Sequence, residues 1–372
     1  PTIPKKIRPI SSSRISLKIK NEDLFLIVFT SGTTGSAKGI CHKFESIVRS
    51  AVSFATLSGM DNKTHIYHIL PMSYMAGLLN TFFAPILLGG QISVDDSFSP
   101  ISGLNFWSRA QKKNINTLIL TPTIATSLCR LTRDQNDARK IAKTMRCIQS
   151  TAGQLSQSTR SLFLEIFDQP LQDCYGLTEL GGPLTTQGPT DARYEECVGR
   201  MLPELNYEFK PSSGKNDELW IKSPFIMIGY LEENGISPPH LSNGYMATGD
   251  LGYFQQEKLY ITGRSKDMII RGGINIAPTM LESIIIKVNG VKDISVVGIQ
   301  DEFWGERIVA CLLIDDPDKT ETIKHLVRDE CAKNLPHIYR PDRVIVIEEF
   351  PRALNGKVKK YELVKLVSEN DG

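Results

Sequence analysis

Over residues 20–200, apolar blocks of strand type alternate with segments of helical spacing. Continuous apolar runs, which are typical of buried strands, occur at 23–30, 65–70 and 117–120. Apolar residues with helical spacing lie between or after them, at about 43–58, 107–113 and 124–131. Strands that alternate with helices are typical of βαβ units, so this part of the chain predicts an α/β fold built on a parallel sheet.

The pattern changes near residue 200. Short apolar runs divided by turn residues predict a small antiparallel or barrel-like β part, with strands at 218–223, 244–254 and 258–262. A polar, glycine-led break at 263–266 is the predicted domain boundary. Beyond it the pattern predicts a small α+β domain, with helices at about 278–288 and 320–334 and strands at 293–299, 307–314 and 343–348. We therefore expect a large domain at 21–263, β-rich from about 200, and a second domain at 264–372.

Composition and charge exclude several classes of protein. The 372 residues are enough for two or three domains, and 43 Lys and Arg against 41 Asp and Glu leave a net charge of only +2. This balance gives no drive toward nucleic acid, and no apolar run approaches the ~20 residues that span a bilayer. Seven scattered cysteines without a C-x-x-C pair predict reduced thiols and a cytoplasmic location rather than a disulfide framework or a zinc site.

The first twenty residues differ from the rest of the chain. Residues 1–20 contain six basic residues and no acidic ones, and they include a serine run at 11–13. We interpret this segment as a basic linker or tail, and a transit peptide is the alternative.

The strongest chemical signal follows the first predicted strand. The segment 30–39 reads Thr30, Ser31, Gly32, Thr33, Thr34, Gly35, Ser36, Ala37, Lys38, Gly39. Its glycines let the backbone approach a ligand closely, its hydroxyls and N–H groups can surround phosphate oxygens, and Lys38 adds a positive charge. It is not a Walker A loop, because Ala37 stands where that motif requires glycine.

This loop resembles the phosphate loop of the adenylate-forming superfamily, which includes acyl-CoA synthetases, peptide-synthetase adenylation domains and luciferases. The match to [ST]-S-G-[ST]-T-G-x-P-K-G is complete except that Ala37 replaces proline. Five further segments occur in the order of that family, and the resemblance covers about residues 24–366. The resemblance implies that Thr30, Ser31, Gly32, Thr33, Thr34, Gly35 and Lys38 hold the ATP phosphates.

The segment 173–179 resembles the Y-G-x-T-E motif of the family. The resemblance implies that Tyr175 and Gly176 lie against the adenine, and that Asp173 accepts a hydrogen bond from its exocyclic amine. Thr178 offers a hydroxyl to the α-phosphate, and Glu179 offers an oxygen ligand to Mg²⁺. Thr178 and Glu179 are therefore predicted to be catalytic.

Three other segments complete the expected nucleotide site. Gly153 lies in the small-residue segment 151–155, which packs on the other face of the adenine in the family. Asp250 lies in a T-G-D segment and is expected to accept hydrogen bonds from the ribose hydroxyls. Arg264 is expected to reach the ribose or a phosphate.

The resemblance also implies a mobile C-terminal domain. Lys266 occupies the hinge position of the family, and Gly272 and Gly273 are expected to border the channel of an acceptor thiol. Lys357, in a P-x-x-x-x-G-K segment, resembles the mobile catalytic lysine that steadies the carboxylate and the α-phosphate.

The acid is constrained by the segment 71–77, which aligns with the substrate pocket of the family. Tyr74 and Gly77 are the predicted pocket residues, and Tyr74 either gates an apolar acyl or aryl tail or simply forms the pocket wall. Because no aspartate is present there to pair with an α-ammonium group, we expect a fatty or aryl acid rather than an amino acid.

The implied reaction is activation of a carboxylic acid by ATP as acyl-AMP, followed by transfer to the thiol of CoA or of a carrier-protein phosphopantetheine. ATP, Mg²⁺ and the thiol are the expected cofactors. Two alternatives remain: an aminoacyl-adenylating enzyme, and a non-catalytic nucleotide-binding relative. The second alternative arises because the family usually carries a further long stretch before the phosphate loop, where this sequence has about 30 residues.

Overall fold

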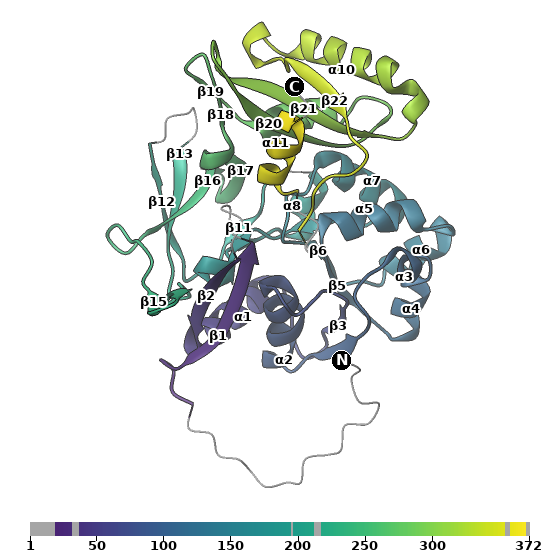
Figure 1. The fold of residues 1–372 in the computed structure, drawn as a ribbon. Helices are drawn as coiled ribbons and strands as arrows, with labels where there is room; N and C mark the ends of the chain where they lie inside the picture. Colours follow the sequence, from purple (N-terminus) through teal and green to yellow (C-terminus); the bar gives the residue numbers. More distant parts are fainter. Residues whose placement is uncertain (1–18, 32–36, 195, 212–216, 354–357, 370–372) are drawn as a thin grey trace.

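The computed structural model describes residues 19–31, 37–194, 196–211, 217–353 and 358–369. As far as residue 264, the described part of the chain contains a parallel sheet, two four-stranded antiparallel sheets, two short two-stranded sheets and the connecting helices. A further mixed sheet with its own helices follows and lies at the top of Figure 1, in green to yellow.

Parallel strands form the central sheet in the order β4-β3-β5-β6-β7. In chain order they are β3 (His65–His68), β4 (Gln91–Val94), β5 (Thr117–Leu120), β6 (Cys147–Ser150) and β7 (Gln172–Asp173). Every residue of β5 and β6 is buried, as expected for strands covered on both faces. The connecting helices are α3 (Pro100–Gly103), α4 (Phe106–Lys112), α5 (Pro122–Leu131), α6 (Gln135–Ala142) and α7 (Gln157–Phe167). The predicted α/β fold is therefore confirmed for this part of the chain.

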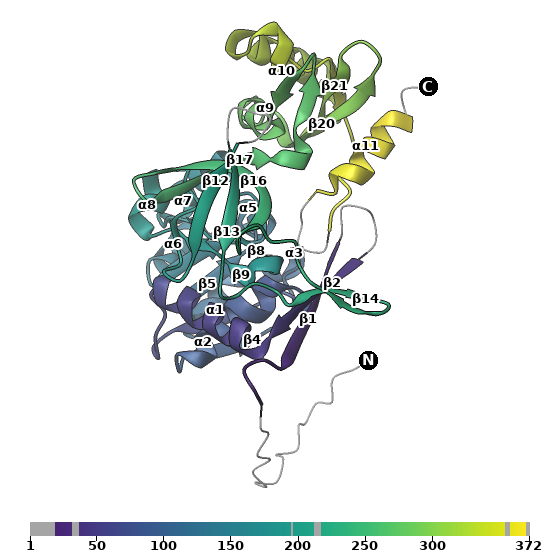
Figure 2. The same cartoon turned by 90° about the vertical axis from the view of Figure 1, so that its left-hand side faces the viewer.

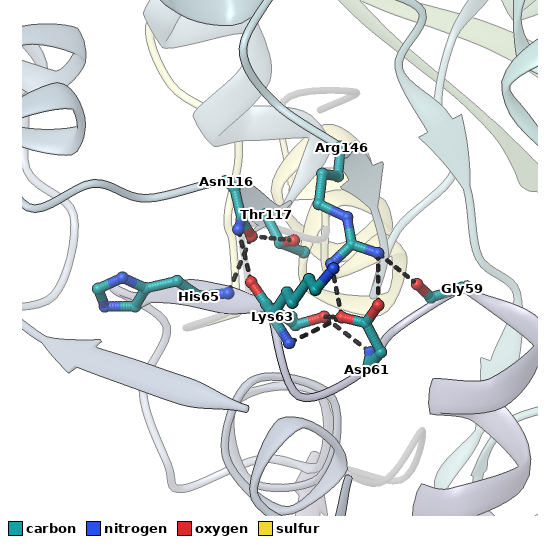
Figure 3. A network of polar contacts seen from close by, with 8 residues as sticks. Gly59, Asp61, Lys63, His65, Asn116, Thr117 and Arg146 are labelled. Carbon is teal, nitrogen blue, oxygen red and sulfur yellow. Dashed lines mark hydrogen bonds and ion pairs between the residues drawn. The ribbon is translucent and has the colours of Figure 1, made fainter. Parts of the chain in front are cut away.

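A polar network joins the loops that enter this sheet (Figure 3). The Asn116 side chain, just before β5, accepts a hydrogen bond from the His65 N–H at 2.8 Å and donates to the Lys63 carbonyl at 2.7 Å. Arg146, just before β6, donates to both carboxylate oxygens of Asp61 at 2.6 and 2.9 Å. These contacts fix the starts of β3, β5 and β6 relative to one another, and so also fix their carboxyl ends.

A second, antiparallel sheet has the order β1-β2-β14-β15. Its strands are β1 (Leu24–Ser31), β2 (Ala37–Lys43), β14 (Gly229–Glu232) and β15 (Gly235–Ser237). Figure 2 shows β1 and β2 beside β14 at the rim of the molecule. Residues 37–39, which we expected in the phosphate loop, therefore belong to a strand.

The prediction that 23–30 is a buried strand of the parallel sheet is wrong. Among the described residues, β1 pairs with β2 alone and forms the edge of the antiparallel sheet. Leu24, Phe25, Ile27 and Phe29 are exposed, and the Phe29 side chain is 58% exposed. An unbroken apolar run does not distinguish a strand with two covered faces from an edge strand that carries apolar residues on its outer face.

Helix α1 (Phe44–Leu57) follows β2, as the sequence predicts. Its buried residues Ile47, Ala51, Phe54 and Ala55 have the i, i+4, i+7, i+8 spacing of one helix face. This face packs toward the π-helix η1 (Ala76–Phe83) and toward α2 (Ala84–Leu87). The helices join the two sheets into one apolar core.

The third sheet is antiparallel, with the order β12-β13-β16-β17. Its strands are β12 (Asn206–Lys210), β13 (Asp217–Lys222), β16 (Met246–Gln255) and β17 (Lys258–Arg264), which confirms the strands predicted there. Short elements lead to it from β7: β8 (Gly176–Leu177), the 3₁₀ turn η2 (Thr178–Leu180), β9 (Gly182–Pro183), β10 (Thr185–Thr186), α8 (Pro189–Tyr194) and β11 (Arg200–Met201).

The last part of the chain begins with the 3₁₀ turn η3 (Ser265–Asp267). Its sheet has the order β19-β18-β21-β20, with β22 parallel to β21. The strands are β18 (Ile269–Arg271), β19 (Ile274–Ile276), β20 (Val291–Asp301), β21 (Gly305–Ile314) and β22 (Arg343–Val346). The other elements are α9 (Pro278–Ile285), η4 (Pro317–Lys319), α10 (Thr320–Asn334), η5 (His337–Tyr339) and α11 (Lys360–Glu369).

Two apolar clusters hold this part together. Successive residues of β20 point to opposite faces: Val296 joins the cluster with α9 and α10, and Val297 joins the cluster with α11. Both clusters are separate from the core of the preceding sheets. The elements predicted beyond residue 278 are therefore confirmed in type and order.

Two further features concern the predictions of reduced thiols and of no membrane-spanning segment. All seven cysteines are buried and free. Within the described ranges, no helix is long and apolar enough to cross a membrane.

Candidate active site

The carboxyl ends of the parallel strands bring two predicted segments together. In the register of β6 and β7, Ser150 lies opposite Asp173, and the Cys174 N–H donates to the Ser150 carbonyl at 2.9 Å. The loop that contains Gly153 therefore lies beside the turn that contains Tyr175. Such an edge, where parallel strands end and helices begin, is the usual ligand site of open α/β sheets.

Tyr175, Asp250 and Arg264 meet in one cluster. The Tyr175 hydroxyl donates to Asp250 Oδ2 at 2.7 Å, and Arg264 Nε donates to Asp250 Oδ1 at 2.7 Å. Asp250 and Arg264 are cross-strand partners on β16 and β17, and Asp250 is 2% exposed. Burial, and then the Asp250 charge, raises the pKa of Tyr175 well above its ordinary value, so the phenol remains a donor. Each carboxylate oxygen can accept a second hydrogen bond, which leaves capacity for ribose hydroxyls.

Asp173, which we expect to accept a hydrogen bond from the adenine amine, also has partners within the chain. Its Oδ2 accepts a hydrogen bond from the buried Arg160 at 2.8 Å, and its Oδ1 accepts the N–H of Cys174 at 2.9 Å. Gln187 Oε1 accepts from both Arg160 and the Asp173 N–H, at 2.9 Å each. Burial raises the pKa of Asp173 to about 6, and Arg160 opposes that effect. In this structure Asp173 fixes the strand end that carries Tyr175.

The turn with Thr178 and Glu179 is held by main-chain contacts. The Glu179 carbonyl accepts the N–H of Met227 at 2.9 Å, and the Ser50 hydroxyl donates to the Gly181 carbonyl at 2.8 Å. A Cβ at Gly176 would overlap the main chain of Gly182, so this close approach requires glycine. Thr178 and Glu179 themselves are half-buried.

The Glu179 carboxylate fits the chemistry of a magnesium ligand. No residue in the described part of the chain donates a hydrogen bond to it, so its oxygens are open to a hard cation. Among those same residues, no group of three or more His, Cys, Asp or Glu is arranged to hold a metal by itself. An ion at Glu179 would therefore need most of its ligands from phosphate oxygens and water, as Mg²⁺ commonly has.

The predicted phosphate loop is bracketed by β1 and β2. Thr30 lies opposite Lys38, and Ser31 lies opposite Ala37, at the end of this antiparallel pair. Gly32, Thr33, Thr34 and Gly35 lie outside the described residues. The Lys38 ammonium lies 5.3 Å from the centre of the Tyr230 ring.

Lys266, the predicted hinge residue, lies in η3 next to the Asp250 cluster. Desolvation, and then the charge of Arg264, lowers the pKa of Lys266, while the charges of Asp267, Asp250 and Glu179 oppose this effect. Lys266 is therefore within electrostatic range of both Asp250 and Glu179. Lys357 lies outside the described residues.

Gly272 and Gly273 form the turn between β18 and β19 in the last part of the chain. Their φ angles are +55° and +78°, a region that favours glycine. The Gly272 N–H donates to the Trp304 carbonyl at 2.8 Å, and a Cβ at Gly272 would lie 3.3 Å from the Trp304 ring. Arg271, the residue directly before this turn, donates to both carboxylate oxygens of Asp342 at 2.6 and 2.7 Å.

The predicted pocket residues lie beside the Glu179 turn. Gly77 is at the start of η1, where a Cβ would overlap the Pro71 carbonyl oxygen. Met75 lies 3.0 Å from the position of a Cβ at Gly182, so η1 packs closely on the segment after Glu179. Burial raises the pKa of Tyr74, so its phenol is neutral.

Sequence reasoning missed three residues next to these segments: Arg160, His42 and Tyr230. Arg160 lies on α7 and neutralises Asp173. His42 lies on β2 and is fully buried, with burial lowering its pKa to about 4. Tyr230 lies on β14 opposite Ile40 of β2. Each of them reaches the site through a pairing or packing contact that is distant in sequence, and no local motif marks them.

Comparison with known proteins identifies the family. Residues 5–231 match the family described as AMP-binding enzyme, and residues 280–357 match the AMP-binding enzyme C-terminal domain. The first match alone covers more than half of the chain, so this chain belongs to the AMP-binding enzyme family. The predicted family is confirmed.

The similar curated proteins are named as CoA ligases. A sulfoacetate–CoA ligase of Cupriavidus necator is 27% identical over 348 residues, which cover 91% of this chain and 66% of the relative. A long-chain-fatty-acid–CoA ligase of Mycobacterium tuberculosis is 27% identical over 369 residues, covering 97% and 71%. The chain thus spans about two thirds of the length of the curated relatives that it matches.

Solved structures share the fold. ATP-bound MatB from Rhodopseudomonas palustris superposes with a TM-score of 0.85 at 23% identity, covering 95% of this chain and 70% of MatB. The o-succinylbenzoate CoA synthetase of Bacillus subtilis, in complex with ATP and magnesium ion, superposes with a TM-score of 0.76 at 24% identity, covering 93% and 70%. These matches confirm the predicted combination of a large α/β part with a smaller C-terminal part.

Proposed function

We propose that this chain activates a carboxylic acid with ATP, forming an acyl-AMP and pyrophosphate, and then transfers the acyl group to a thiol. The observation that carries the proposal is the convergence of Tyr175, Asp250 and Arg264 beside the Glu179 turn. Tyr175 and Gly153 offer surfaces to a purine at the carboxyl end of the sheet, and Asp250 offers acceptors to a ribose. The family and the names of the relatives support this reaction class.

In the first step a carboxylate oxygen attacks the α-phosphorus of ATP, and the bond between that phosphorus and the bridging oxygen breaks as pyrophosphate leaves. Little covalent chemistry falls to the protein, so positioning and electrostatic stabilisation carry the catalysis. Thr178 would orient the α-phosphate, and Lys38 would lie near the β- and γ-phosphates. Mg²⁺ held by Glu179 would supply positive charge to the phosphate oxygens. We assign Lys357 to the carboxylate and the α-phosphate.

In the second step a thiolate attacks the acyl carbon, and AMP leaves as the thioester forms. We propose that the chain divides into domains at 263–264, because the apolar clusters on the two sides are separate, and that it rotates at Lys266 between the steps. The Gly272–Gly273 turn would then border the path of the thiol.

The substrates are proposed from the pocket and from the relatives. Tyr74 is neutral and half-buried, and it pairs poorly with an α-ammonium group, which supports a fatty or aryl acid. CoA is the favoured acceptor because the relatives are CoA ligases, and a carrier-protein phosphopantetheine is the alternative. Seven free cysteines support a reducing cytoplasmic compartment.

The test is ATP–pyrophosphate exchange with a panel of fatty, aryl and amino acids. We expect exchange with a fatty or aryl acid and thioester formation on addition of CoA. Replacing Lys357 by Ala should lower the exchange rate about 10²–10³-fold, because a charge on the reacting oxygens is lost.

Lys359→Ala is the matched control, because Lys359 forms an exposed pair with Glu362 and should leave exchange unchanged. Exchange with amino acids alone would favour the aminoacyl alternative. Binding of AMP without exchange for any acid would favour the non-catalytic alternative. An unchanged rate for Lys357→Ala would refute the role of this lysine.

A further inference from the structure

The strand pairing places Tyr230 diagonally across from Lys38. Tyr230 on β14 lies directly opposite Ile40 on β2, and Lys38 lies two residues before Ile40 on the same strand. Residues two apart on a strand point to the same face, and diagonal neighbours are within reach of long or aromatic side chains. The Lys38 ammonium accordingly lies 5.3 Å from the Tyr230 ring centre, within the range of a cation–π contact.

The backbone is arranged for this close pairing. Gly39 lies opposite Leu231, and a Cβ at Gly39 would lie 3.0 Å from the Leu231 Cβ. A larger residue at position 39 would push β14 away from β2. Glycine at this position therefore lets β14 bring the Tyr230 ring up to the Lys38 side chain.

The charge of the predicted magnesium ligand, Glu179, also acts on Tyr230. Burial, and then the negative charge of Glu179, raises the pKa of Tyr230. Tyr230 is therefore in cation–π contact with Lys38 and within electrostatic range of Glu179.

We infer that Tyr230 is a positioning residue for the triphosphate of ATP, which acts by holding the Lys38 ammonium beside the end of the β1–β2 pair. This inference rests on the proposed function, because it takes ATP as the ligand. The side chain of Lys38 is exposed and long, and without a partner its ammonium would sample many positions. The aromatic face restricts it without neutralising its charge, which an acidic partner would do.

The test compares ligands with and without the β- and γ-phosphates. We would measure the dissociation constants of ATP and of AMP by calorimetry in magnesium-containing buffer, for the full chain and its variants. Tyr230→Leu removes the ring face, and an exposed cation–π contact is equivalent to about a two- to fivefold change in affinity. We expect ATP binding to weaken by that factor and AMP binding to stay unchanged.

Three further variants separate positioning from a structural role. Tyr230→Phe keeps the ring face and should restore ATP affinity. Tyr230→Leu should have no further effect in a Lys38→Met background, since the residue acts through that ammonium. Tyr253→Leu changes an exposed tyrosine of β16 that stacks on Tyr260 and should leave both ligands unaffected.

Equal weakening of ATP and AMP by Tyr230→Leu, or the same loss with and without Lys38, would overturn the inference. The dissociation constants of ATP and AMP are measured without any acid. If no acid gave exchange but Tyr230→Leu weakened ATP binding and not AMP binding, only the proposed function would be refuted. If Tyr230→Leu weakens ATP binding but not AMP binding, and the unaltered chain catalyses exchange, the role of Tyr230 and the proposed function are both supported.

Discussion

The parallel sheet and the β1-β2-β14-β15 sheet both present site residues, but they hold them in different ways. The parallel sheet carries the Gly153 and Tyr175 turns on strands that are buried on both faces. The antiparallel sheet carries the predicted phosphate loop between an exposed edge strand and a buried one. The turns with Gly153 and Tyr175 are thus held by a buried core, whereas the residues that flank the predicted phosphate loop are held by the pairing of β1 with β2.

Two phenylalanines show the difference. Phe163 on α7 is fully buried against the parallel sheet, and its ring centre lies 4.6 Å from that of Phe167. Phe29 on β1 is 58% exposed, and its ring lies over the backbone of Gly39. The same side chain should therefore contribute very different amounts to the free energy of unfolding in the two regions.

The largest effect is expected for Phe163→Ala. Removing a fully buried aromatic ring loses its transfer free energy and leaves a cavity, at a cost of about 3–5 kcal/mol. The measurement is urea-induced unfolding followed by circular dichroism. A loss below 1 kcal/mol would mean that the helices over the parallel sheet are packed loosely, and the contrast between the two regions would disappear.

A smaller, pH-dependent effect is expected at His42, where the two regions meet. Among the described residues, neither ring nitrogen makes a hydrogen bond of good geometry. Burial lowers the pKa of His42 from 6.5 to about 4, and a weaker interaction with the Thr178 backbone opposes this effect. The unfolded chain therefore binds a proton that the folded chain does not bind between those pH values. Stability is complete above pH 6.5 and falls as the pH drops toward 4, by about 2 kcal/mol between pH 7 and pH 5.

The measurement is the free energy of unfolding at pH 7 and pH 5 for the unaltered chain and for His42→Leu. The variant should lose this part of the pH dependence, whereas a matched His240→Leu change at an exposed site should keep it. An identical pH dependence in the unaltered chain and in His42→Leu would show that His42 reaches water or a partner in solution.

Much of the fold follows from local pattern. The strand predicted at 117–120 and the helix predicted at 320–334 coincide with β5 and α10, because an apolar run of strand length and a helical period were present there without conflict. Tyr175, Asp250 and Arg264 were predicted one by one from short motifs, and the structure joins them through Asp250.

The remaining features depend on which strands pair. The exposure of β1 follows from its edge position, and the contact of Lys38 with Tyr230 follows from the register of β2 with β14. The first depends on β1 having no partner strand on one side among the described residues, and the second on two strands that are far apart in sequence. A hydrophobic pattern along the chain does not specify which strands pair. The Arg160 contact with Asp173 was missed for the same reason, since it joins α7 to the end of β7.

The smallest effect is expected for Phe29→Ala, the counterpart of Phe163→Ala. Most of the Phe29 ring is already in water, and a cross-strand contact of this kind is worth about 0.2–1 kcal/mol. We therefore expect a loss below 1 kcal/mol in the same urea experiment. The dissociation constant of AMP should change little, because in the described part of the chain β1 pairs with β2 and not with β16 or β17, which carry Asp250 and Arg264. A loss of several kcal/mol would mean that the outer face of β1 is covered in solution. The two sheets would then be stabilised in the same way, by burial.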